Sequence, residues 1–177
     1  MNVTVQEAGR VLGISKGAAS RLAACGLLGE VSMRGNRRTV SAAAVLKLQN
    51  RANVELPAPP AFVVRVGEPT EAQDGWRSWI GWSTSWATAT KQNAVRGDWV
   101  IDPFFVLRSG RLVVLVSGFV VAAYAVTGLE RQIWDEEANR RRARFLVKHD
   151  KDIASPFINR RWPLPPGWTV SVIDTHR

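Results

Sequence analysis

The sequence of 177 residues has a single cysteine, Cys25, and only two histidines, His149 and His176. One cysteine cannot close an internal disulfide, so the sequence favours a reducing compartment and predicts that Cys25 packs as a small hydrophobic side chain. Neither histidine has a second His or Cys at metal-ligand spacing. We therefore expect no metal site and no other cofactor.

Catalytic signatures are also missing, because the chain has no nucleophile-elbow, phosphate-loop or dinucleotide-binding motif. Asp98, Asp102 and Glu130 are the best carboxylates for a metal-dependent nuclease. Asp98 and Asp102 stand four apart in a strand-like segment, however, and no paired Glu-x-Lys follows them. The sequence thus predicts a binding protein rather than an enzyme.

Long apolar runs are scarce. The most apolar stretch, 112–126, is interrupted by Ser117 and Gly118 and is shorter than the roughly 20 residues that a membrane-spanning helix needs. We interpret it as a buried β-hairpin and expect no membrane association. The first residues, MNVTVQEAG, lack the order of a secretory signal, so we expect a cytoplasmic protein.

What the sequence does have is an excess of cations. There are 24 Lys and Arg residues against 15 acidic ones, for a formal net charge of +9, and the isoelectric point is about 11. Residues 1–61 hold eight cations and three acids, whereas the remainder holds sixteen and twelve. Both parts are basic, the first more densely, which favours a polyanionic partner.

Prolines divide the chain. The segment 51–61, RANVELPAPPA, has three prolines within four residues, which disfavours helix and strand and predicts a stiff, extended linker. We therefore expect one domain over residues 1–50 and a second over residues 62–177.

The first domain has the signals of three helices. Thr4 and Glu7 have the spacing of a reciprocal capping box at the start of a helix over 5–12. Gly13 can end that helix, and Ser15 can cap a second helix over 16–24. Two short helices separated by such a turn form a helix-turn-helix, whose second helix enters a DNA major groove.

A basic hairpin follows. Residues 30–33 and 37–40 are short extended runs around Arg34, Gly35 and Asn36, where Gly and Asn suit positive φ at a tip. Ser41 can then cap a third helix over 42–51. The order predicts a winged helix-turn-helix.

These residues carry a family resemblance. The order GISKGAASRLAACGLL, RGNRRTVS and a short helix resembles the winged helix-turn-helix of the MerR and excisionase group over residues 3–50. The matching positions are the Gly13-Ile14-Ser15 step, Arg21-Leu22, the Gly26-Leu27-Leu28 step and the wing tip. The resemblance implies binding to double-stranded DNA, and with it a nucleoid-associated protein of a bacterium or phage. The small residues Gly17, Ala18 and Ala19 depart from the group and imply that the second helix makes few specific contacts with bases.

Eight residues are the candidate DNA contacts: Ser15, Lys16, Ser20, Arg21, Arg34, Asn36, Arg37 and Arg38. The cations would hold phosphates, and the residues of the second helix would read bases. Glu7 and Glu30 are expected away from the duplex. The alternative is a small helical domain that makes only protein contacts.

The second domain is predicted to be mainly β. Strand candidates, rich in Val and aromatic residues, are 62–66, 99–101, 112–117, 119–126, 143–147 and 169–172. Short helices are expected over 87–95 and over 134–140. The predicted fold class is α+β, with an N-terminal winged helix-turn-helix and a C-terminal mixed, mainly β, barrel-like domain.

All eight tryptophans lie in the second domain, and four of them fall in the segment GWRSWIGWSTSW at 75–86, which we expect to be a loop. Cations such as Arg77 and Arg96 are interleaved with the rings, a combination that suits stacking on nucleobases along a phosphate chain. A plain aromatic core is the alternative. The candidate pocket residues are Trp76, Trp79, Trp82, Trp99, Asn159, Arg160, Arg161 and Trp162.

A second resemblance is looser. The segments GDWVIDP, LVVLVSGFVVAAYAVTG, ARFLV and INRRWPLPPG resemble the PUA-like β-barrel group, which implies a pocket for RNA or for a flipped, modified base. The basic run 137–145 is interpreted first as a solvated face and second as a binding patch.

Two function classes follow from the sequence. The first is a DNA-binding transcriptional regulator whose Trp-rich domain adds nucleic-acid contact or senses a modified base or small ligand. The second is a nucleic-acid processing or restriction accessory of a mobile element, either a nuclease or a modified-base reader. The sequence leaves the oligomeric state open.

Overall fold

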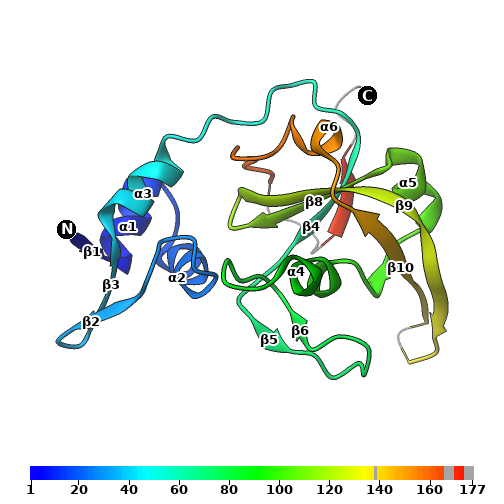
Figure 1. The fold of residues 1–177 in the computed structure, drawn as a ribbon, viewed down its shortest axis with the longest axis horizontal. Coiled ribbons are helices and arrows are strands. Elements are labelled where there is room, and N and C mark those ends of the chain that lie inside the picture. The colour runs from blue at the N-terminus through cyan, green and yellow to red at the C-terminus, as the bar shows by residue number, and fades with distance from the viewer. Residues whose placement is uncertain (138, 166–169, 174–177) are drawn as a thin grey trace.

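In the computed structural model, residues 1–137, 139–165 and 170–173 are described (Figure 1). The chain forms two units joined by a long segment. The N-terminal unit consists of β1 (Asn2–Thr4), α1 (Val5–Leu12), α2 (Lys16–Ala24), β2 (Ser32–Arg34), β3 (Arg37–Ser41) and α3 (Ala42–Gln49). Its strands form an antiparallel sheet in the order β1-β3-β2, and the hairpin β2–β3 projects away from the helices (Figure 1).

Local capping signals set the bounds of these helices as the sequence predicted. The capping box between Thr4 and Glu7 begins α1, and Gly13 ends it at φ 67°. Ser15 and Ser41 accept hydrogen bonds from amides in the first turns of α2 and α3. Two details differ. The strand β1 was not expected, and only Gly35 has positive φ at the hairpin tip.

The predicted linker lies against the rest of the chain. Residues 50–60 form no regular helix or strand, but Val54 and Ala58 are buried in a core cluster of the C-terminal unit. The Val54 amide donates to the carbonyl of Arg161 at 2.8 Å, and the Arg161 amide donates to the carbonyl of Ala52 at 2.8 Å. The segment is therefore fixed by apolar burial and backbone hydrogen bonds.

The C-terminal unit is built on a six-stranded, curled sheet that forms half of a barrel (Figure 1). Its strand order is β11-β4-β8-β9-β10-β7, and β4 pairs with β8 in parallel while the other pairs are antiparallel. The strands are β4 (Ala61–Arg65), β7 (Trp99–Val100), β8 (Arg111–Val116), β9 (Phe119–Asp135), β10 (Arg140–Lys148) and β11 (Val170–Ile173). The chain is thus α+β, as predicted.

Helices and a small ribbon surround this sheet (Figure 1). They are β5 (Thr70–Glu71), β6 (Trp79–Ile80), α4 (Thr88–Val95), α5 (Pro103–Ser109) and α6 (Lys151–Ala154). Strand β6 of this ribbon lies within the Trp-rich segment 75–86, which the sequence predicted to be a loop, whereas β5 precedes that segment. None of the helices in the described residues is long and apolar enough to cross a membrane.

In the second unit the predicted apolar hairpin is confirmed, and one predicted helix is wrong. The stretch 112–126 is a buried hairpin, turned by Ser117 and Gly118 at φ 49° and 83°. The helix expected over 134–140 is instead the end of the hairpin β9–β10. Backbone pairing there is reinforced by the ion pair of Arg142 with Asp135 at 2.6 Å, so extended structure prevails over helix.

The helix α5 was missed although its signals are present. Asp102 accepts a hydrogen bond from the Phe104 amide, Pro103 occupies the first turn, and Gly110 ends the helix at φ 64°. The helix was missed because the periodicity of a short run of bulky apolar residues does not by itself distinguish a helix from a strand.

The two units are in direct contact along α2, from its first turn to the residue that follows it. The Cys25 thiol donates to the carbonyl of Gly67 at 3.3 Å, and the Thr84 amide donates to the carbonyl of Cys25 at 3.0 Å. The Ser117 hydroxyl, at the tip of hairpin β8–β9, donates to the carbonyl of Ala18 at 3.1 Å. One hydrophobic cluster continues from the N-terminal unit into the C-terminal sheet.

Cys25 packs as the sequence predicted. Its side chain is fully buried, and burial raises the pKa of the thiol to about 11. The nearby carboxylate of Glu68 acts in the same direction. The thiol therefore stays protonated at neutral pH and can serve as the hydrogen-bond donor that joins the units.

Gly81 is the tightest backbone position of the Trp-rich segment. It has φ 94°, and an added Cβ would overlap the carbonyl oxygen of Glu68 and lie 2.9 Å from its carbonyl carbon. Gly75 has a similar φ, 73°, with nothing within 4 Å of the added Cβ. We predict that Gly75→Ala costs about 1 kcal/mol of unfolding free energy and Gly81→Ala about 3 kcal/mol or more. Urea titrations of both variants measure the two losses of unfolding free energy. Equal losses would contradict the close contact of Gly81 with Glu68.

Candidate nucleic-acid interface

The start of α1 contributes a fixed carboxylate to the surface of the N-terminal unit. Oε2 of Glu7 accepts from the amide and the hydroxyl of Thr4, each at 2.8 Å, while Thr4 Oγ1 accepts from the Glu7 amide at 3.2 Å. The hydrogen bonds from Thr4 lower the pKa of Glu7, and the charges of Arg10 and Arg37 act in the same direction. The carboxylate is therefore held ionised at the helix start.

The first turn of α2 presents its polar residues to solvent. Ser15 Oγ accepts from the Ala18 amide at 3.1 Å and so orders the turn that carries Lys16. Ser20 follows one turn later, on the same helical face as Lys16. Lys16 is exposed and Ser20 is half-buried, whereas Ala19 and Leu22 are buried in the core.

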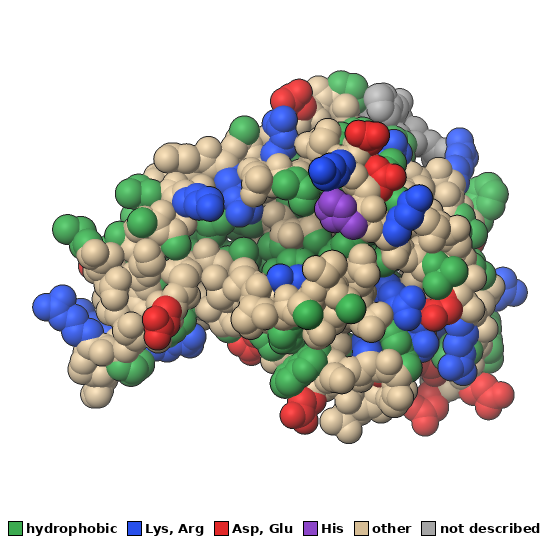
Figure 2. Space-filling model, viewed as in Figure 1, with side chains coloured by type: hydrophobic (Ala, Val, Ile, Leu, Met, Phe, Trp, Pro, Cys, Tyr) green, Lys and Arg blue, Asp and Glu red, His purple; other side chains and the backbone are tan. Residues whose placement is uncertain are grey.

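The hairpin β2–β3 places four polar residues beside that helix face. Arg34 pairs with Arg37 and Met33 with Arg38 across the ladder, and the four residues Arg34, Asn36, Arg37 and Arg38 are all exposed. Lys and Arg side chains are visible at this end of the molecule (Figure 2).

These elements enclose a surface groove of about 490 Å³. It lies between the starts of α1 and α2 and the hairpin, and five of the eight predicted DNA contacts line it: Lys16, Ser20, Asn36, Arg37 and Arg38. Arg10 lines it too, so the groove has four cations against the single carboxylate of Glu7. The arrangement gives a concave, polar and positively charged surface.

Three predicted contacts lie elsewhere, and one expectation was wrong. Ser15, Arg21 and Arg34 are exposed but do not line the groove. Glu7, expected away from the duplex, lines the groove, because the capping box fixes it in the first turn of α1 next to the hairpin. Arg10 was missed, although it stands one turn after Glu7 in the sequence.

The predicted Trp pocket is divided among several places. Trp76 and Trp79 line a small cavity of about 190 Å³ together with Thr90 and Asn93. Trp82 and Asn159 line a different pocket between the two units. The eight candidate residues therefore do not form one site.

Arginines enclose Trp76. The guanidinium carbons of Arg144, Arg77 and Arg96 lie 3.6, 4.7 and 5.3 Å from its ring centroid. Arg77 also donates to the carbonyls of Ala94 and Gly97 at 3.1 and 2.9 Å. The interleaving of Trp and Arg in this part of the sequence thus serves an internal cation–π cluster.

The remaining rings are largely structural. Trp99 is half-buried and its indole N–H donates to the carbonyl of Val95 at 2.9 Å. Trp162 is buried and stacks on Phe157 with a centroid distance of 5.4 Å. Trp79 and Trp86 are half-buried and pair at 5.7 Å. Trp168 and His176 lie outside the described residues, and Trp134, which the pocket prediction omitted, is 55% exposed.

Arg160 and Arg161 hold the chain together instead of closing a pocket. Arg160 donates to the carbonyl of Asn53 at 3.2 Å and pairs with Glu55 at 2.9 Å. Arg161 donates to the carbonyl of Leu12, at the end of α1, at 3.2 Å. Both cations therefore secure the linker and the N-terminal unit to the sheet.

The candidate nuclease carboxylates have other partners. Asp98 accepts two hydrogen bonds from Arg144 at 3.1 and 2.8 Å, Asp102 caps α5, and Glu130 pairs with Arg96 at 3.3 Å. Within the described part of the chain, no three His, Cys, Asp or Glu side chains are grouped as a metal site would require.

Comparisons with protein families, with characterised proteins and with solved structures give no match to this chain.

The pair of Asp98 with Arg144 links stability to pH. Partial burial raises the pKa of Asp98, but the hydrogen bonds and charge of Arg144 outweigh it, so the pKa lies below its usual 3.8. A depressed pKa stabilises the fold above the unfolded-state value and loses that effect as pH falls through the folded-state value. We predict that Asp98→Asn costs about 1 to 3 kcal/mol at pH 7.

The difference in unfolding free energy between the parent and Asp98→Asn should shrink below pH 4, where the parent carboxylate becomes protonated. Urea unfolding at pH 7 and at several values below 4 measures it. A difference that is constant across this range would exclude the ion pair as its cause.

Proposed function

We propose that this protein binds double-stranded DNA through its N-terminal unit, as a transcriptional regulator. The single observation that carries the proposal is the basic groove between α2 and the hairpin β2–β3, lined by Lys16, Ser20, Asn36, Arg37 and Arg38. Cations that converge from a helix start and a hairpin suit the phosphates that flank a DNA groove.

The proposed docking is that of a winged helix-turn-helix. The start of α2, capped by Ser15, points its first turn at the major groove, and the hairpin follows the neighbouring backbone. Lys16 and Ser20 share the helix face that lines the groove, so they are the residues placed to read base edges. The resemblance to the MerR and excisionase motifs supports this orientation.

The carboxylate of Glu7 has a defined place in this proposal. It repels phosphate directly, but Arg10 and Arg37 lie close enough to lower its pKa. A negative charge between cations attracts the cationic side chains and restrains them. Phosphates are then bound only at positions where they approach the cations and not the carboxylate. The groove then favours a particular register on the duplex.

The first test removes the hairpin cations. Arg37→Ala with Arg38→Ala should weaken DNA binding and lower the slope of log K against log salt by about 0.9 per lost phosphate contact, hence by up to about 1.8. Fluorescence-anisotropy titrations of a genomic fragment at several salt concentrations measure both quantities.

A matched control has the same change of net charge at another place. Arg140 and Arg141 are exposed on β10, outside the groove. Arg140→Ala with Arg141→Ala should leave the slope nearly unchanged. The proposed interface would be refuted by equal slopes in both double variants.

A second candidate function, base recognition by the C-terminal unit, is favoured by the small cavity of Trp79, Thr90 and Asn93. A half-buried indole offers a stacking face, and the Asn93 amide has a donor and an acceptor for a base edge. The loose PUA-like resemblance supports a single unpaired or modified base as the ligand.

For this candidate we predict a loss of affinity in Trp79→Ala. Stacking on an aromatic ring contributes about 1 to 3 kcal/mol per base, so binding of a mixed-sequence single-stranded oligonucleotide should weaken about 5- to 150-fold. Fluorescence anisotropy of a dye-labelled oligonucleotide measures the affinity, and thermal melting establishes that the variant is folded. Unchanged affinity in the folded variant would eliminate base stacking at Trp79.

A further inference from the structure

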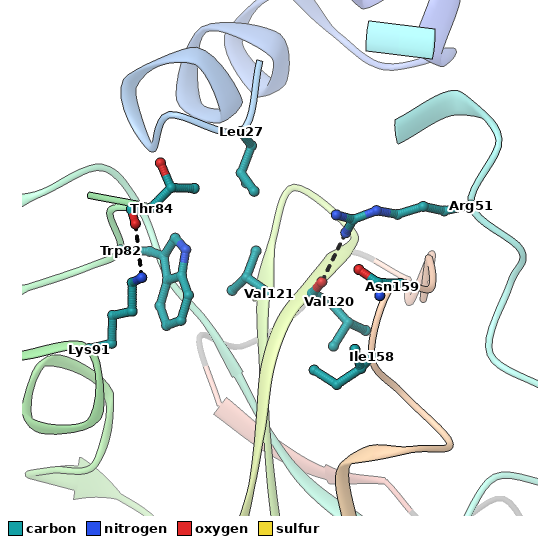
Figure 3. A pocket seen from close by; sticks show the side chains of 9 residues that line it. All are labelled: Leu27, Arg51, Trp82, Thr84, Lys91, Val120, Val121, Ile158 and Asn159. Carbon is teal, nitrogen blue, oxygen red and sulfur yellow. Dashed lines mark hydrogen bonds between the residues drawn. The ribbon is translucent and has the colours of Figure 1, made fainter. Parts of the chain in front are cut away.

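A pocket of about 210 Å³ lies where the two units meet, and residues of both units line it (Figure 3). Leu27, after α2, and Arg51, after α3, come from the N-terminal side. Trp82 and Lys91 lie on the other side, with Val121 of β9 between them and Arg51 (Figure 3). The molecular surface in this region is a hollow with hydrophobic side chains on its floor (Figure 2).

Two cations face this pocket from opposite sides. Arg51 is half-buried, and one of its amino groups donates to the carbonyl of Val120 at 3.1 Å. Lys91 donates to the carbonyl of Thr84 at 2.9 Å and lies 5.7 Å from the ring centroid of Trp82. A guanidinium has five N–H donors and an ammonium three, so both retain donors for a ligand.

The pocket has no carboxylate to neutralise these charges. None of its lining residues is acidic, and within the described part of the chain neither Arg51 nor Lys91 forms an ion pair. Burial lowers the pKa of Arg51, which is the mark of a cation removed from water without a compensating anion. A partly desolvated cation of this kind favours an anionic ligand.

The rest of the lining is apolar apart from two short polar groups. Leu27, Val121 and Ile158 provide aliphatic surface, and Trp82 adds an aromatic ring (Figure 3). Asn159 is held at φ 59° and offers its amide at the rim beside Arg51 (Figure 3). The pocket is smaller than the roughly 300 to 1,000 Å³ of a drug-sized site, so its ligand is small.

We propose that this pocket binds a small organic carboxylate with an apolar body. The carboxylate lies between Arg51 and Lys91, and the body lies against Leu27, Val121 and the Trp82 ring. A duplex phosphate does not suit the place, because the apolar walls and small volume exclude a polymer backbone. This site goes beyond the proposed DNA binding and does not depend on it.

Such a ligand would strengthen the attachment of the two units. It would contact Leu27 after α2 and Arg51 after α3 on one side, and the C-terminal unit on the other. A compound that binds only when these surfaces are together stabilises their joined state by mass action. The expected consequence is reduced amide exchange around Leu27 when the ligand is present.

The test uses the full chain in a carboxylate-free buffer, with benzoate, salicylate and isovalerate as probes and benzamide as the neutral isostere of benzoate. A binding carboxylate should raise the melting temperature with the logarithm of its concentration, by about 5 to 10 °C at roughly 100 times its Kd. Benzamide at the same concentration should shift it far less. The proposal is overturned if none of the three acids binds, or if benzamide binds as tightly as benzoate.

Variants locate the site. Arg51→Gln and Lys91→Gln should each weaken carboxylate binding about 10- to 100-fold in calorimetric titrations, whereas Lys47→Gln, an exposed residue of α3, should not. Val121→Phe keeps both cations but fills the pocket, and it should abolish binding while circular dichroism stays unchanged. Undiminished binding in the folded Val121→Phe variant, or equal losses in Lys47→Gln, would place the ligand elsewhere.

Discussion

The docking of α2 and of the residue after it on the C-terminal unit is the contact on which the rest of this structure depends. Three hydrogen bonds form along this contact, donated by the Cys25 thiol, the Thr84 amide and the Ser117 hydroxyl. Each joins chain segments that are distant in sequence, and each involves at least one backbone group. Because buried backbone groups are costly to leave without partners, separating the units costs these bonds as well as the shared apolar core.

The excess of cations is divided between two tasks. Arg144, Arg77, Arg160 and Arg161 are used internally, on carboxylates, carbonyls and aromatic faces. The cations of the groove are solvent-exposed and converge on one concavity. Net charge therefore overstates the surface available to a polyanion, and the placement of each cation decides what it does.

Local signals made the N-terminal unit predictable. The capping residues Thr4, Ser15 and Ser41 satisfy amides within their own first turns, so their effect is visible in the sequence. The fate of the tryptophans was not visible in this way. Whether Trp76 stacks on a base or on Arg144 is decided by the position of β10, and no pattern near Trp76 contains that information. The pocket at Arg51 likewise draws on several separate segments.

The hydrogen-bonded contact between α2 and the C-terminal unit also has a geometric consequence. In the proposed complex, a helix seated in a DNA groove would carry the C-terminal unit at one fixed azimuth around the duplex. DNA turns once in about 10 to 10.5 base pairs, so a shift of the binding site by half a turn would present that unit to the opposite face. The side of the duplex on which the C-terminal unit meets another molecule would then depend on the position of the binding site within the helical turn.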